Sequence, residues 1–160
     1  MGNSFKAFGI KTSTSKIIRP LPVRWVFLSP DWVKINIDGA VGGYPGHATY
    51  GGIIFRGSMR EFIWAFSAFL EVQTALVVEF YGVIHAMEEA QKMGFIDVWL
   101  ECDSALVCDA FAARTNVPWK LRNRWNVCLN YCGKIRFRVT HIFREGNGCA
   151  DKLANLRFFS

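Results

Sequence analysis

The sequence predicts an α/β domain in which a five-stranded mixed sheet has helices packed on it. Three observations favour this fold class. The chain has 160 residues, about the size of one domain, and 51% of them are hydrophobic while 20% are charged, which is enough apolar material for a core. Some segments alternate apolar with polar residues or have the composition of strands. Others have capping residues and apolar residues at helical spacing. Their order is βββαβααβα, and no internal repeat is visible.

The first three strands are expected near the start of the domain. In DWVKINID, Val33, Ile35 and Ile37 alternate with polar residues, which is the periodicity of a strand. HATYGGIIFR and EFIWAFSAF are apolar, aromatic and β-branched, and the turn-like GSMR separates them. Four glycines are expected to break the first strand: Gly39, Gly42, Gly43 and Gly46. We therefore expect a meander over residues 31–38, 47–56 and 61–69.

The clearest helix is expected over residues 74–94. Thr74 is placed to cap its first turn and Gly94 to end it. An apolar stripe at helical spacing indicates a buried face, formed by Leu76, Phe80, Val83 and Met87. The apolar segment that follows Gly94, residues 95–103, is expected to be the fourth strand.

Two helices, a strand and a closing helix are expected in the rest of the chain. Ser104 is placed to cap the first of these helices. For the second, Asn116 is a cap candidate, Pro118 suits the first turn, and Gly133 would end the helix. KIRFRVTHIF alternates like a strand. The expected ranges are 104–114, 116–133, 134–143 and 146–158.

Charge is distributed unevenly along the chain, whose formal net charge is +6. Residues 1–30 contain five basic and no acidic residues, which leaves 14 of the 19 basic residues against all 13 acidic ones. Residues 61–110 contain nine acids and one base, whereas residues 114–144 contain eight bases and no acid. One half could therefore attract metal cations and the other phosphates.

The composition also limits the cellular setting. Residues 1–30 are basic and rich in Ser and Thr, so we expect a linker or tail before a domain over 31–160, with an organelle transit peptide as the alternative. No apolar run reaches the roughly 18 residues of a membrane span. Five cysteines lack the paired spacing of a zinc site and are expected to be reduced thiols: Cys102, Cys108, Cys128, Cys132 and Cys149. We expect an intracellular monomer, nuclear or cytoplasmic, that does not enter a membrane.

Four carboxylates stand at positions that suggest a common site. Asp38 and Asp103 end predicted strands, and the carboxyl ends of strands in α/β sheets border the usual ligand crevice. Glu79 lies along the apolar stripe of its helix, where a lone carboxylate is costly unless a cation accompanies it. Asp151 falls in the first turn of the closing helix, where the helix dipole favours an anion. Each also has a purely structural alternative. Asp38 could form a turn, and Glu79 could lie at the edge of the apolar stripe. Asp103 could cap a helix, and Asp151 could interact with the helix dipole.

Four sequence blocks, read together, carry a family resemblance. NIDGA, VVEFYG, LECDSALV and HIFREGNGCADKLAN resemble the type 1 ribonuclease H family, and most of all its reverse transcriptase-like branch in plant genomes, which is related to non-LTR retroelements. The resemblance covers about residues 24–158, and the last block is the most specific. It implies a ribonuclease H-like fold.

The resemblance also implies roles for individual residues. Asp38, Glu79, Asp103 and Asp151 would form a catalytic tetrad that holds two Mg²⁺ ions, with Mn²⁺ as a substitute. His141 would transfer protons near the leaving group, and Asn147 would help to position substrate or water. The backbone around Gly39 and Ala40 would approach the RNA 2′-hydroxyl.

Elementary chemistry agrees with these roles. Carboxylate oxygens are hard ligands that suit Mg²⁺, which keeps several waters and is completed by substrate phosphate. Two such ions about 4 Å apart can hold the attacking water and the leaving oxygen of an in-line displacement. A histidine beside them can move a proton near neutral pH. For His141, the alternative is a strand histidine that is merely hydrogen-bonded.

A basic segment could hold the substrate. Lys120, Arg122 and Arg124 share one predicted helix and fall mostly off its apolar stripe. Such side chains can bind phosphates with little sequence preference, although a solvated basic face is the alternative. The leading hypothesis is thus a Mg²⁺-dependent endonuclease that cuts the RNA strand of RNA–DNA hybrids. Two alternatives are a weak or inactive nucleic-acid-binding domain derived from a retroelement, and a fragment of a larger retroelement polyprotein.

Overall fold

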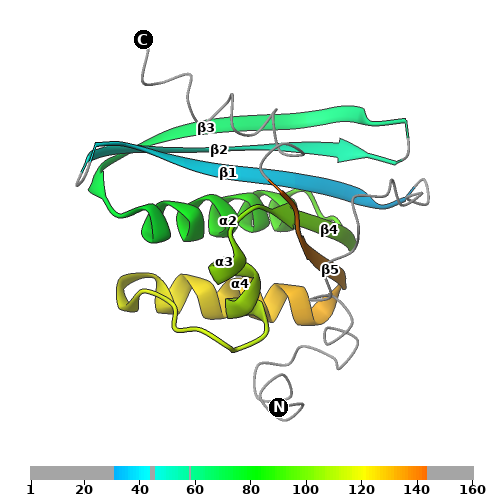
Figure 1. The fold of residues 1–160 in the computed structure, drawn as a ribbon. Coiled ribbons are helices and arrows are strands. Elements are labelled where there is room, and N and C mark those ends of the chain that lie inside the picture. Colours follow the sequence, from blue (N-terminus) through cyan, green and yellow to red (C-terminus); the bar gives the residue numbers. More distant parts are fainter. Residues whose placement is uncertain (1–30, 44–45, 58, 144–160) are drawn as a thin grey trace.

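The computed structural model describes residues 31–43, 46–57 and 59–143. The N-terminal segment and the predicted closing helix lie outside these residues, and so do three residues singled out above, Asn147, Cys149 and Asp151. Within the described part the elements follow the predicted order (Figure 1). No helix there is both long enough and apolar enough to cross a membrane.

A five-stranded mixed sheet forms the centre of the fold, as predicted. The strands are β1 (Val33–Gly43), β2 (Gly46–Arg56), β3 (Glu61–Gln73), β4 (Asp97–Cys102) and β5 (Arg136–His141). They lie side by side in the order β3-β2-β1-β4-β5. β1, β2 and β3 pair antiparallel, as a meander, whereas β4 is parallel to both β1 and β5. The carboxyl ends of β1, β4 and β5 therefore point the same way.

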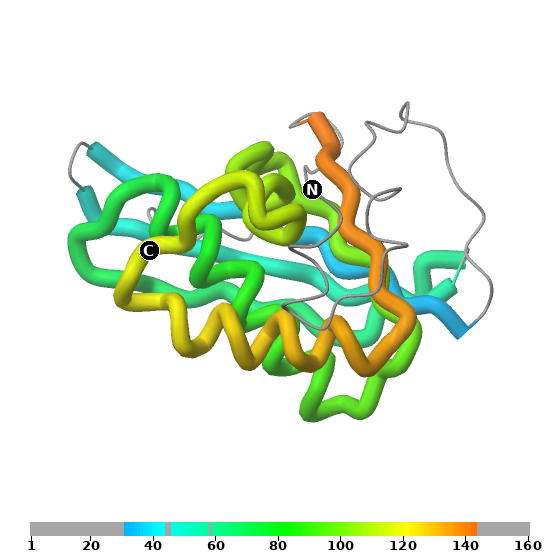
Figure 2. Tube along the Cα trace, turned by 90° about the horizontal axis from the view of Figure 1, so that it is seen from below, coloured from blue at the N-terminus to red at the C-terminus, as the bar shows by residue number. Residues whose placement is uncertain are grey.

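The helices cover one face of this sheet (Figure 2). α2 (Ala75–Lys92) packs on β1 and β2, and α4 (Arg122–Lys134) packs on α2 and β5 (Figure 1). The short α3 (Ala105–Phe111) follows β4, and a 3-10 turn, η2 (Trp119–Leu121), precedes α4. The core between the layers is built from aliphatic and aromatic side chains that are almost fully buried, including Ile35, Ile37, Phe80, Val83, Ile84, Met87, Leu100 and Trp125.

Three predicted helix boundaries are confirmed by their local bonding. The Thr74 hydroxyl accepts a hydrogen bond from the Val77 amide at 3.5 Å, and the Ser104 hydroxyl accepts one from the Val107 amide at 3.4 Å. Such N-caps satisfy amides that have no partner within the helix. Gly94 follows the last turn of α2 with φ of 74°, a conformation that costs glycine little.

Other boundaries differ from the prediction. β1 does not stop at Gly39 but continues to Gly43, because it remains paired with β2 along its whole length. The glycines instead permit a tight hairpin, since a Cβ on Gly46 would lie 1.9 Å from the Gly42 carbonyl oxygen. Asn116 does not cap α4, because Pro118 has ψ of 130°, which is not helical, and α4 begins after η2. It also runs one residue past Gly133, to Lys134.

Gly82, in the middle of α2, gives a first prediction about stability. It is buried, and a Cβ at this position would meet only Tyr50, at 3.6 Å, which is ordinary van der Waals contact. Alanine restricts the unfolded chain and favours the helix, so Gly82→Ala should raise the free energy of unfolding by about 0.5–1 kcal/mol. Urea unfolding should show a higher midpoint with an unchanged slope. A lower midpoint would mean that the Tyr50 contact cannot accept a methyl group.

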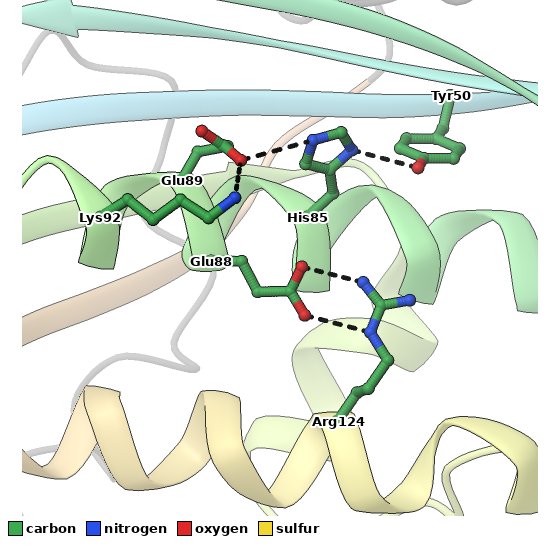
Figure 3. Close-up of polar contacts among 6 residues, drawn as sticks. All are labelled: Tyr50, His85, Glu88, Glu89, Lys92 and Arg124. Atoms are coloured by element: carbon green, nitrogen blue, oxygen red, sulfur yellow. Dashed lines mark hydrogen bonds and ion pairs between the residues drawn. The ribbon is translucent and has the colours of Figure 1, made fainter.

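A polar network ties α2 to the sheet and to α4 (Figure 3). The Tyr50 hydroxyl and Nδ1 of His85 share a hydrogen bond of 3.1 Å, and Nε2 of His85 faces the Glu89 carboxylate at 3.9 Å. On the other side of α2, Arg124 donates two hydrogen bonds to Glu88, at 3.0 and 2.9 Å. Because α2 also carries Glu79, these contacts help to fix the position of that carboxylate.

The environment of His85 predicts how stability depends on pH. Burial lowers the pKa of His85 below its usual 6.5, and the nearby Glu89 and Glu88 only partly oppose this. The unfolded chain therefore takes up a proton at higher pH than the folded chain does. Stability should fall as the pH drops below 6.5 toward the folded-state pKa.

The test compares the free energy of unfolding at pH 7.5 and 5.5, measured in urea. The loss seen in the wild-type chain should shrink in His85→Gln and persist in His47→Gln, which changes an exposed histidine. An equal loss in wild type and His85→Gln would contradict the assignment to His85.

Candidate active site

Two of the predicted acids lie where the parallel pairing of β1 with β4 ends. The register of β1 and β4 pairs Ile37 with Cys102, so Asp38 and Asp103 come next on the two strands. Asp38 is only 1% exposed, and its Oδ1 accepts a hydrogen bond from the Gly39 amide at 2.9 Å. Both acids therefore lie at the carboxyl-terminal edge of the sheet, where ligand crevices of α/β sheets are found.

The third predicted acid reaches the same edge from α2. Glu79, Cys102 and Asp103 each place one donor atom within 4.8 Å of the other two. Asp38 is not a member of this close group, but the next residue in the chain, Gly39, lies directly against Glu79. A Cβ on Gly39 would lie 3.4 Å from the Glu79 carboxylate and 2.7 Å from Cγ1 of Val78, so only glycine lets β1 and α2 approach this closely.

His141 completes the described part of the site. It is paired with Cys102 across β4 and β5, and its Nε2 lies 2.9 Å from the Asp103 carbonyl oxygen. Since a carbonyl can only accept, Nε2 carries the hydrogen and the neutral ring has its lone pair on Nδ1. His141 is half-buried and is thus held at the same edge of the sheet as the carboxylates.

A cavity of about 330 Å³ opens beside these groups. Its polar lining comes from Glu79, Asp103, Ser104 and His141. Its apolar walls come from the first turns of α2 and α3 and from the segment after β5, namely Ala75, Leu76, Leu106, Ile142 and Phe143. The site can therefore admit a ligand to two carboxylates and one imidazole at once.

Comparison with known sequences now decides the family. Residues 36–157 match the family described as Reverse transcriptase-like, which is well over half of the chain. The chain belongs to the reverse transcriptase-like family. A relative in Arabidopsis thaliana, named "Putative ribonuclease H protein At1g65750", is 31% identical over 137 residues, which cover 85% of this chain. The match spans only 22% of that relative's own length.

Solved structures of ribonucleases H share the fold of this reverse transcriptase-like domain. Ribonuclease H1 from the archaeon Halobacterium salinarum is 27% identical, with a TM-score of 0.69 over 80% of this chain and 98% of that one. The N-terminal ribonuclease H domain of rv2228c from Mycobacterium tuberculosis is 26% identical, with a TM-score of 0.69 over 78% and 96%. LC11-RNase H1, isolated from compost and solved with an RNA/DNA hybrid, is 25% identical, with a TM-score of 0.68 over 80% and 99%. The ribonuclease H-like fold predicted from the sequence is thus confirmed.

Sequence reasoning did not identify Cys102 as a residue of the candidate site. Its side chain is fully buried, and its sulfur accepts a hydrogen bond from the Ser104 amide at 3.3 Å. A hydrogen bond with Cys108, together with burial, raises the pKa of the Cys102 thiol well above its usual value. The only signal in the sequence was its place directly before Asp103 at the end of a predicted strand. As expected, the four cysteines that the structure describes are not in disulfides.

The predicted substrate-binding residues lie in two places. Gly39 and Ala40 are in β1, beside the carboxylates. Lys120 and Arg122 are exposed, but they do not share one helix, because Lys120 lies in η2 and Arg122 begins α4. The Lys120 ammonium lies 5.7 Å from the ring of Trp119. Arg124 differs from them, because its guanidinium donates two hydrogen bonds to Glu88, although the side chain is 42% exposed. These bonds join α2 to α4, and a phosphate contact by Arg124 stays a prediction.

Proposed function

We propose that this domain is a Mg²⁺-dependent endonuclease that hydrolyses the RNA strand of RNA–DNA hybrids. The observation that carries the proposal is the meeting of Glu79, Asp103 and His141 around one cavity, with Asp38 on the adjacent strand β1. These residues come from four separate elements. Their convergence, in a chain whose fold matches ribonucleases H, favours a catalytic site over four unrelated structural roles.

The donor set fits a divalent cation. Asp38, Glu79 and Asp103 offer hard carboxylate oxygens, which are the ligands that Mg²⁺ prefers. Asp151, which lies outside the described residues, would be the fourth ligand. When bound, Mg²⁺ supplies Lewis-acid activation of water and neutralises charge on the leaving oxygen. The repulsion between Glu79 and Asp103, whose donor atoms lie within 4.8 Å, would then be relieved.

His141 is placed to move the proton. Its Nε2–H is held by the Asp103 carbonyl oxygen, so Nδ1 is the atom that can accept or deliver a proton. The hydrogen bond also fixes the plane of the ring, which pre-orients it for proton transfer. Asn147, outside the described residues, would help to position substrate or water.

Substrate contacts would come from both predicted groups. Close approach of a nucleic-acid strand to the backbone at Gly39 and Ala40 would allow contact with an RNA 2′-hydroxyl, the group that distinguishes RNA from DNA. Lys120 and Arg122 are exposed and could hold phosphates without sequence preference. The relative LC11-RNase H1, solved with an RNA/DNA hybrid, supports this choice of substrate class.

The proposal is tested with the full chain and end-labelled substrates. In Mg²⁺ we expect internal cuts in the RNA strand of a hybrid, no cuts in its DNA strand, and no cleavage of duplex DNA of the same sequence. Excess EDTA should stop the reaction, and added Mg²⁺ should restore it. Binding of the hybrid without any cleavage would overturn the proposal in favour of a non-catalytic binding domain.

A further inference from the structure

A sulfur atom lies among the carboxylates of the candidate active site. Cys102, Glu79 and Asp103 belong to β4, to α2 and to the turn after β4, yet one donor atom of each lies within 4.8 Å of the others. The family resemblance assigns no role to this thiol. The group therefore combines two oxygen donors with one sulfur donor.

The mixed donor set differs chemically from an all-carboxylate site. Carboxylate oxygens suit Mg²⁺ and Mn²⁺, whereas a thiolate selects softer cations such as Cd²⁺, Zn²⁺ and Co²⁺. Borderline cations bind both types of ligand, and zinc sites combine Cys with Asp or Glu. Glu79 and Asp103 also line the cavity, so a cation entering from solvent meets the carboxylates first and lies close to the Cys102 sulfur.

We propose that Cys102, together with Glu79 and Asp103, binds a thiophilic divalent cation in competition with Mg²⁺. The competition with Mg²⁺ rests on the proposed function, whereas the binding of the softer cation does not. When the metal–sulfur bond forms, the thiol proton leaves to the solvent buffer. The Ser104 amide, already donating to the sulfur at 3.3 Å, stabilises the charge that remains.

The experiment titrates the reduced full chain with Cd²⁺, without nucleic acid and with a phosphine reductant that leaves thiols free. We expect an ultraviolet sulfur-to-cadmium charge-transfer band that saturates at about one equivalent. The band should disappear in Cys102→Ser. It should remain in Cys108→Ser, the matched control, which removes a neighbouring buried thiol that is not in the donor group.

Two further measurements keep the proposal testable if Cys102→Ser does not fold. Glu79→Gln leaves every thiol in place and should weaken Cd²⁺ binding by at least about tenfold, because removing even an outer-shell partner of a metal ligand costs that much. Excess Mg²⁺ should shift the wild-type titration to higher Cd²⁺. A band that persists in Cys102→Ser, or a Cd²⁺ affinity unchanged in Glu79→Gln, overturns the proposal.

These readouts are independent of nuclease activity. A chain that shows the Cys102-dependent band but does not cleave hybrids would retain the mixed site and lose the proposed function. A chain that cleaves hybrids in Mg²⁺ but shows no band would retain the proposed function and lose the mixed site.

Discussion

Asp38→Asn should reduce the rate of RNA cleavage in a hybrid by at least about 100-fold, the scale on which enzymes lose rate when a group that stabilises the transition state is removed. Asparagine has nearly the shape of aspartate, and its amide oxygen can still accept the hydrogen bond that the Gly39 amide donates at 2.9 Å. The substitution therefore removes a carboxylate, the proposed metal ligand, from a residue that is 1% exposed, without opening a cavity. Single-turnover cleavage in Mg²⁺ measures the effect directly.

Asp109→Asn is the matched control for this substitution. Asp109 lies in α3, outside the donor group and outside the lining of the cavity, so its replacement should leave the cleavage rate within about twofold. Both variants should unfold cooperatively at a temperature near that of the wild type. Cleavage by Asp38→Asn at the wild-type rate would remove Asp38 from the catalytic group.

The two variants should also differ in how Mg²⁺ affects their stability. A cation that binds only the folded chain raises the melting temperature, and the increase becomes smaller when a ligand is lost. Mg²⁺ should therefore stabilise Asp109→Asn as much as wild type, and Asp38→Asn less.

Local patterns in the sequence were sufficient for most of the fold. The alternation of Val33, Ile35 and Ile37 marks a strand because one face of β1 is buried against α2, and the side chains of Thr74 and Ser104 form the caps that their positions predict. The start of α4 could not be derived in this way. Proline is common in the first turn of helices. Here, however, Pro118 has an extended ψ and precedes a 3-10 turn instead.

The candidate site was less accessible to sequence reasoning. Asp38, Glu79 and Asp103 were singled out from their positions and the family resemblance, and the structure brings all three to one edge of the sheet. Cys102 escaped because every residue of β4 is buried, so the strand has no polar alternation to show which way the thiol points. Likewise, nothing near Arg124 in the sequence reveals its partner Glu88, which is 36 residues away and accepts hydrogen bonds from the guanidinium.

Phe80→Ala should lower the free energy of unfolding by about 3–5 kcal/mol, the usual cost of removing a fully buried aromatic side chain. Phe80 is 0% exposed and meets the ring of Trp125 edge to face, with centroids 5.1 Å apart. It thus joins α2 to α4 in the layer beneath the sheet, and the cavity left by alanine would lie between three packed elements that cannot easily collapse. Chemical unfolding followed by tryptophan fluorescence measures the loss.

Two further variants are controls for this loss of stability. Phe80→Leu, which keeps most of the buried volume, should recover more than half of the stability that Phe80→Ala loses. Phe69→Ala changes a side chain that is 47% exposed on the edge strand β3, and it should cost less than about half as much as Phe80→Ala.

The position of Phe80 next to Glu79 extends the consequence to function. If α2 shifts when its packing is lost, Glu79 moves away from Asp103, and cleavage should decrease in Phe80→Ala even at temperatures where the variant remains folded. Full activity of a folded Phe80→Ala would show instead that the polar contacts of His85 and Glu88 are sufficient to hold α2 in place.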